Sequence, residues 1–173
     1  MIVVTGVMAS GKSTVADLLA RRLDPSVHLR GDLFRKMIVN GRAELRPDDP
    51  HAVSQLRLRH RLSAQAADTY AAAGFGVVVQ DIILGDLLEE YVALVRARPL
   101  RVVVLAPSIG AVADRERARG KVGYGSTWTP ERLDAVLRRD TPRLGLWVDS
   151  SDETPEETVG GILARLDDAI VAT

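Results

Sequence analysis

The chain has 173 residues, of which 46% are hydrophobic, enough to fill the core of one domain. Its 23 basic and 23 acidic side chains cancel, so the overall charge gives no electrostatic reason to expect a nucleic-acid or membrane-surface partner. The absence of cysteine excludes disulfides, thiolate metal sites and a cysteine nucleophile.

Short apolar runs alternate with helical patterns along the whole sequence. The runs are rich in Val, Ile and Leu, as expected of strands that are buried on both faces of a parallel sheet. The alternation predicts one three-layer α/β domain over residues 1–173, with helices on both faces of the sheet. The predicted strands are Ile2–Thr5, Ser26–Leu29, Gly76–Gln80, Leu100–Leu105 and Leu144–Val148.

Helices are predicted between these strands. The first, Lys12–Leu23, carries an apolar stripe typical of a helix packed on a sheet. Two later helices have clear start signals, because Thr129 and Thr154 are good N-caps and each is followed by a proline. Glu157 completes a capping box with Thr154, and the apolar stripe of that last helix runs on to Ile170.

The segment GVMASGKST, residues 6–14, lies between the first predicted strand and the first predicted helix. Gly6, Gly11, Lys12 and Ser13 fit the G-x-x-x-x-G-K-[ST] pattern of a phosphate-binding loop. Glycine at 6 and 11 permits the backbone N–H groups to point at nucleotide phosphates, where a Cβ would obstruct them. We expect Lys12 to reach the β- and γ-phosphate oxygens and Ser13 to bind Mg²⁺. The other predicted nucleotide-binding residues of the loop are Ala9, Ser10 and Thr14. For Thr14 the alternatives are a contact with the α-phosphate and simple membership of the first helical turn.

Two other classes of phosphate-loop protein are not indicated. A GTPase would carry an N-K-x-D segment after a later strand, and a transporter-type ATPase would need an LSGGQ-like signature and more chain. Transfer of the terminal phosphate to another molecule is therefore favoured. The sequence has no run of 18 apolar residues and no charged leader, so we expect no membrane span and a location in the cytoplasm, where the cell keeps its ATP.

Asp32 follows the second predicted strand directly, in HLRGDLFRKMI. Ligands gather at the ends of parallel strands in open α/β sheets, so a carboxylate here is placed to accept a proton from an attacking hydroxyl. Arg35, three residues on, is predicted to hold an anionic acceptor or to stabilise charge on the transferred group. The alternative interpretation makes Asp32 a helix N-cap and Arg35 its surface partner.

Asp81 closes the apolar run GVVVQD. An acid in this place often orders Mg²⁺ through water, and orientation of the substrate and capping of a helix are the alternatives. Gln80 is a weaker candidate for the same role.

A predicted lid covers about residues 115–128, where an arginine-rich helix runs into a glycine-rich segment. Arg115 and Arg119 share one helix face and are predicted to contact phosphate or adenine, with Arg119 also stabilising the transferred charge. Arg117 is interpreted as a surface residue. Tyr124 and Trp128 flank the lid and either face the acceptor or anchor the lid.

The acceptor is predicted to bind through an insertion at about residues 40–70. Arg57 and Arg61 share a helix face there and form either a basic pocket or a solvated surface, with Arg59 on the opposite face. Adenine is expected near the loop after the fifth strand. Its candidate residues are Asp149, Ser150 and Ser151, and the histidines at 28, 51 and 60 are interpreted as structural or surface residues.

The phosphate loop, GDLFR, GVVVQD and RERARGK occur in the order seen in small-molecule P-loop kinases, and the sequence resembles that family. Relatives are gluconate and shikimate kinases, the polynucleotide 5′-kinase domain and chloramphenicol phosphotransferase, to which the resemblance is greatest through QDIILGD. The resemblance implies five parallel strands in the order 2-3-1-4-5, use of ATP and Mg²⁺, and Asp32 as the general base.

These features together predict a kinase that phosphorylates a hydroxyl of a small molecule, with an antibiotic or related natural product as the leading substrate class. A nucleoside or polynucleotide 5′-kinase is one alternative, but the neutral charge and the scarcity of aromatic residues disfavour a nucleic-acid substrate. An ATP-sensing regulator that transfers no phosphate is another.

Overall fold

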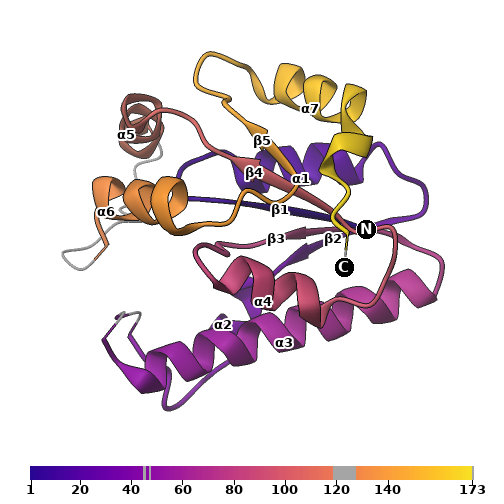
Figure 1. The fold of residues 1–173 in the computed structure, drawn as a ribbon. Helices are drawn as coiled ribbons and strands as arrows, with labels where there is room; N and C mark the ends of the chain where they lie inside the picture. Colours follow the sequence, from indigo (N-terminus) through magenta and orange to yellow (C-terminus); the bar gives the residue numbers. More distant parts are fainter. Residues whose placement is uncertain (45, 47, 119–127, 173) are drawn as a thin grey trace.

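The computed structural model describes residues 1–44, 46, 48–118 and 128–172 of the chain. Five parallel strands form one sheet in the order β2-β3-β1-β4-β5, with helices on both of its faces (Figure 1). The predicted fold and strand order are confirmed. The strands are β1 (Ile2–Gly6), β2 (Ser26–Arg30), β3 (Gly76–Gln80), β4 (Arg101–Leu105) and β5 (Leu146–Val148).

Helices lie between successive strands along the chain, as connections between parallel strands require. A π-helical turn, Val136–Asp140, continues α6, and a 3₁₀ turn, Leu166–Ala169, follows α7. The α-helices are α1 (Lys12–Ala20), α2 (Asp32–Lys36), α3 (Pro50–Ala72), α4 (Leu87–Leu94), α5 (Ile109–Ala118), α6 (Pro130–Ala135) and α7 (Pro155–Ala164).

The sheet separates two hydrophobic cores. On one face, Val15 and Leu19 of α1 and Ile162 of α7 pack against alternate residues of the central strands. On the other face, α3 and α4 cover the sheet, and Leu88 and Tyr91 of α4 are fully buried. Figure 1 shows α1 and α7 on one side of the sheet and α3 and α4 on the other.

Several predicted element ends are shifted, for local reasons. α1 ends at Ala20 instead of Leu23, because the chain tightens into turns there and then reaches Pro25, which disfavours a preceding helix. β5 begins at Leu146 instead of Leu144, because Gly145 has a φ of +67° and a Cβ there would lie 2.2 Å from the Val102 carbonyl oxygen. The last helix ends at Ala164, short of the predicted Ile170.

The start signals of the later helices are confirmed. Thr129 accepts a hydrogen bond from the backbone N–H of Arg132, and Thr154 and Glu157 form the capping box. The predicted insertion at 40–70 is largely one helix, α3, which has 23 residues and forms the crossover from β2 to β3. Within the described residues, no helix combines the length and the apolar character that a bilayer crossing needs.

Candidate active site at the carboxyl ends of the strands

The loop between β1 and α1 has the backbone that a phosphate cradle requires. Gly6 has a φ of +144° and Gly11 a φ of +95°, and a Cβ on Gly6 would lie 2.4 Å from the Leu105 carbonyl oxygen. Ala9 has a φ of +58°, and within the described part of the chain it is the one non-glycine residue with positive φ. Strained backbone of this kind is concentrated at ligand-binding loops.

Lys12 and Ser13 make hydrogen bonds to the loop and to the neighbouring strand β3. Lys12 is buried and its Nζ donates a hydrogen bond to the carbonyl oxygen of Val7. Ser13 donates from its Oγ to Oε1 of Gln80, at 3.2 Å, which connects the start of α1 to the end of β3. The Oγ of Ser10 is buried and has no hydrogen-bond partner in the structure, whereas Thr14 is exposed.

The strand register brings the carboxyl end of β2 to the same edge of the sheet as the phosphate loop. Val4 pairs with Gln80, and Gln80 pairs with Arg30, so these three residues form one row across β1, β3 and β2. Gly6 and Asp32 each lie two residues beyond that row. The start of the phosphate loop and the predicted base therefore share the carboxyl edge of the sheet, where ligands bind in this class of fold.

Asp32 begins α2, and its neighbour Gly31 is the N-cap residue, so the N-cap interpretation of Asp32 is wrong. The ion-pair partner of Asp32 on the helix is Lys36, at i+4, and not Arg35. Arg30 Nε lies 3.5 Å from Asp32 Oδ1, an oxygen that is shielded from solvent and accepts no hydrogen bond.

The charges around Asp32 keep it ionised. Burial raises the pKa of the Asp32 carboxyl, but the hydrogen bond from Lys36 and the charges of Arg30, Lys36 and Arg59 outweigh it, so the pKa lies below its ordinary value. A carboxylate that is ionised at neutral pH is chemically able to take a proton.

Arg35 points toward the segment that follows α2. Its guanidinium donates a hydrogen bond of 2.7 Å to the carbonyl oxygen of Ala43, and burial together with the charge of Arg42 lowers the pKa of Arg35. This contact fixes the loop after α2. A role of Arg35 toward the acceptor stays a prediction.

Asp81 forms a buried ion pair with Arg59 of α3. Arg59 Nε donates to Asp81 Oδ2 at 2.7 Å, and a second guanidinium nitrogen contacts Oδ1, which also accepts the backbone N–H of Ile82 at 2.7 Å. The two residues are 7% and 1% exposed. Burial lowers the pKa of Arg59 to about 10. The charge of Asp32 raises this pKa, and the charge of Arg35 lowers it further.

The burial of Arg59 is the main feature that sequence reasoning missed. The sequence predicts only that Arg59 lies on the helix face opposite Arg57 and Arg61, whereas in the structure this residue lies on the buried stripe of α3. A signal was available, because Arg59, Ser63 and Ala67 repeat every four residues and the latter two are small enough to pack against strands.

Arg115 joins three segments near the phosphate loop. Its guanidinium lies 3.5 Å from the carbonyl oxygen of Ser10 and donates to the carbonyl oxygens of Ser150 and Ser151 in the loop after β5. Ser151 in turn accepts the backbone N–H of Ser108 and bonds Asp149. The predicted phosphate and adenine residues of these segments are thus brought together.

The rest of the predicted lid is only partly described. Arg119, Lys121 and Tyr124 lie outside the described residues. Trp128 packs under the guanidinium of Arg132, whose carbon lies 5.7 Å from the ring centroid. Arg117 pairs with Asp114 on the surface, in agreement with its interpretation.

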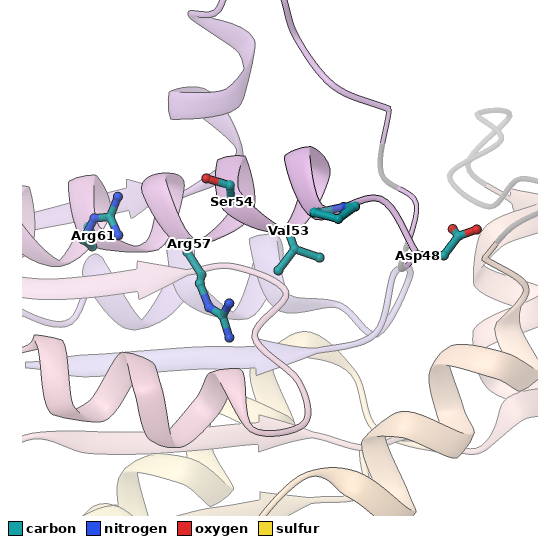
Figure 2. Close-up of a pocket in the computed structure, with 6 residues that line it drawn as sticks. Asp48, Val53, Ser54, Arg57 and Arg61 are labelled. Atoms are coloured by element: carbon teal, nitrogen blue, oxygen red, sulfur yellow. The ribbon is translucent and has the colours of Figure 1, made fainter.

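The basic face of α3 lines a pocket of about 360 Å³ with the loop before it (Figure 2). Arg57 and Arg61 both lie on this pocket, but Arg57 is already paired with Glu90 of α4 through two hydrogen bonds. No residue of the phosphate loop contributes to its wall. The lining residues are Asp48, Pro50, Val53, Ser54, Arg57 and Arg61.

The comparisons with known proteins agree with this architecture. The AAA domain family matches residues 1–157. The chain belongs to the AAA domain family. It is also 29% identical to a UPF0200 protein from Thermococcus gammatolerans, over 99% of this chain and 85% of that protein.

Solved structures similar to this AAA domain protein include kinases. A sugar kinase from Janibacter sp. HTCC2649 matches with a TM-score of 0.73 and 20% identity, over 97% of this chain and 94% of the other. The APS kinase of Mycobacterium tuberculosis matches with a TM-score of 0.68 and 20% identity, over 96% of each chain. The tunicamycin resistance protein of Deinococcus radiodurans matches with a TM-score of 0.65 and 15% identity, over 99% and 98%. The chain therefore has the fold of P-loop kinases, and the narrower resemblance to chloramphenicol phosphotransferase stays a prediction.

The residues of this AAA domain protein fit a nucleotide with Mg²⁺. The cradle at Gly6 has no room for a Cβ, Lys12 supplies a buried cation, and Ser13 and Gln80 supply neutral oxygens. Mg²⁺ prefers oxygen ligands and retains water and phosphate in its shell, so it does not require a cluster of acids. The described residues contain no such cluster of three or more His, Cys, Asp or Glu side chains.

Proposed function

We propose that this AAA domain protein is an ATP-dependent kinase that transfers the γ-phosphoryl group to a hydroxyl of a small molecule. The proposal rests on Asp32, an ionised carboxylate at the same sheet edge as the phosphate loop.

In the proposed reaction, Lys12 neutralises charge on the β- and γ-phosphate oxygens, and Ser13 holds Mg²⁺, which screens the phosphates when bound. The acceptor hydroxyl gives its proton to Asp32 while its oxygen forms a bond to the γ-phosphorus. The bond from that phosphorus to the bridging oxygen breaks, and ADP leaves. Arg35, Arg115 and Arg119 are the proposed cationic residues that stabilise the charge of the phosphates.

The acceptor class is proposed as an antibiotic or a related hydroxylated small molecule. Fold neighbours named as a sugar kinase and as a tunicamycin resistance protein support a small acceptor, and the balanced charge of the chain disfavours a polynucleotide. We place the activity in the cytoplasm, where ATP is available.

The test is a screen for transfer of labelled phosphate from ATP with Mg²⁺ to panels of antibiotics, sugars, nucleosides and an oligonucleotide. Candidate acceptors are first selected by thermal shift with ATP·Mg²⁺ present, because a ligand that binds the native state raises the melting temperature. We expect one small hydroxylated compound to become labelled by the wild-type protein and not by Lys12→Met. Labelling of the oligonucleotide would support the 5′-kinase alternative, and tight ATP binding without any product would support a regulator.

A further inference from the structure

We propose that Gln80, and not Asp81, is the β3 residue that serves the Mg²⁺ side of the site, by orienting the Ser13 hydroxyl. The inference rests on the nucleotide-binding part of the proposed function. Asp81 belongs instead to the opposite face of the sheet, where Arg59 holds it.

The alternation of β3 supports this assignment. Val77 and Val79 pack in the core beneath α3 and α4, whereas Val78 packs in the core beneath α1 and α7. Successive side chains of a strand point to opposite faces, so Gln80 follows Val78 onto the α1 face and Asp81 follows Val79 onto the α3 face. The phosphate-binding helix is α1, and hence the residue beside it is Gln80.

The contacts of Gln80 agree with this direction. Its Oε1 accepts the hydrogen bond from Ser13 Oγ at 3.2 Å, and the residue is 6% exposed. Its backbone is fixed on both sides, because Gln80 pairs with Val4 of β1 and its carbonyl oxygen accepts the N–H of Gly31 at 3.0 Å. The amide therefore occupies a rigid position next to the start of α1.

The carboxylate of Asp81 is committed elsewhere. Both of its oxygens contact Arg59, and Oδ1 also accepts the N–H of Ile82. A Cβ on Gly31 would lie 2.0 Å from Oδ2, so the carboxylate fills the space beside this glycine. Asp81 thus ties α3 to the end of β3 and lies against the turn before Asp32.

The chemistry of the serine hydroxyl gives Gln80 a positioning role. A serine hydroxyl has one proton to donate and two lone pairs to offer. When Gln80 Oε1 accepts the proton, the lone pairs of Ser13 Oγ remain available to a cation. Gln80 therefore prepares Ser13 for Mg²⁺ without adding a negative charge.

The test is binding of a non-hydrolysable ATP analogue by calorimetry, in EDTA and at saturating Mg²⁺, which needs no turnover. We expect Gln80→Leu to reduce the gain in affinity from Mg²⁺ by about 5-fold, the size of one net hydrogen bond, with affinity in EDTA unchanged. Gln80→Glu keeps an acceptor for the Ser13 proton and should retain the gain. Asp81→Asn should also retain it.

Asp81→Asn leaves Arg59 unpaired and can unfold the protein, so the double variant Arg59→Met/Asp81→Asn is measured in parallel and checked by thermal melting. Loss of the Mg²⁺ gain in a folded Asp81 variant, or its retention in Gln80→Leu, overturns the inference and leaves the proposed kinase standing. A wild-type protein that binds no analogue, or binds it without any gain from Mg²⁺, overturns both.

Discussion

At the scale of single residues, the environment of Asp32 determines whether it can act as a base. Lys36 and Arg30 contact its carboxylate, and their charges together with that of Arg59 lower its pKa despite partial burial. A lowered pKa keeps the base ionised as the pH falls, so activity that depends on ionised Asp32 extends to more acidic pH. These cations thus extend the working range of the proposed enzyme.

Replacement of Lys36 should reveal this effect. Lys36→Met removes a hydrogen bond and a charge that lower the pKa of Asp32, so the acidic limb of the pH profile of kcat/KM should move to higher pH. Lys36→Arg retains the charge and should keep the limb near its original place. An unchanged limb in Lys36→Met would mean that another group controls the acidic side of the profile.

At the scale of elements, the pair Arg59–Asp81 joins α3 to the end of β3. Breaking a buried pair leaves an uncompensated charge in the interior, which is far more costly than replacing both partners. The pair therefore makes the position of the long crossover helix dependent on the strand end that borders the site.

The single variant Arg59→Met should lower the free energy of unfolding by about 3–5 kcal/mol, because Asp81 is left buried and unpaired. In the double variant Arg59→Met/Asp81→Asn most of this loss should be recovered. Urea unfolding of the two variants measures both quantities, with Arg57→Met, an exposed ion-pair partner on the same helix, as the control. Equal losses in the single and double variants would show that the pairing contributes little.

The elements also show what the sequence could predict and why the rest escaped. Continuous Val and Ile runs located β3 without error, and the other strands to within two residues, because burial on both faces leaves a strong signal. The interval between Arg59 and Asp81 is 22 residues, and nothing local in the sequence says that these two charges meet. Alternation alone predicts that Gln80 and Asp81 point to opposite faces, but which face α1 covers is a property of the folded chain.

At the scale of the whole molecule, the strand order brings the separate motifs together. With β3 between β2 and β1, the phosphate loop, Gln80 and Asp32 lie at the carboxyl ends of three neighbouring strands. The chain is neutral overall, yet Asp32 is surrounded by the cations Arg30, Lys36 and Arg59. The neutral net charge therefore conceals a local group of cations that keeps the Asp32 carboxyl ionised.

The most direct measurement of the central claim compares Asp32→Asn with the wild-type protein in single-turnover transfer from ATP·Mg²⁺ to the acceptor found by the screen. A matched control is Asp17→Asn, since Asp17 is likewise paired with a cation at i+4 but lies on the exposed side of α1. The account predicts that transfer falls on the order of 10²–10⁴-fold in Asp32→Asn, while ATP affinity and transfer by Asp17→Asn stay close to wild type. Transfer at the wild-type rate by Asp32→Asn would contradict the assignment of Asp32 as the base.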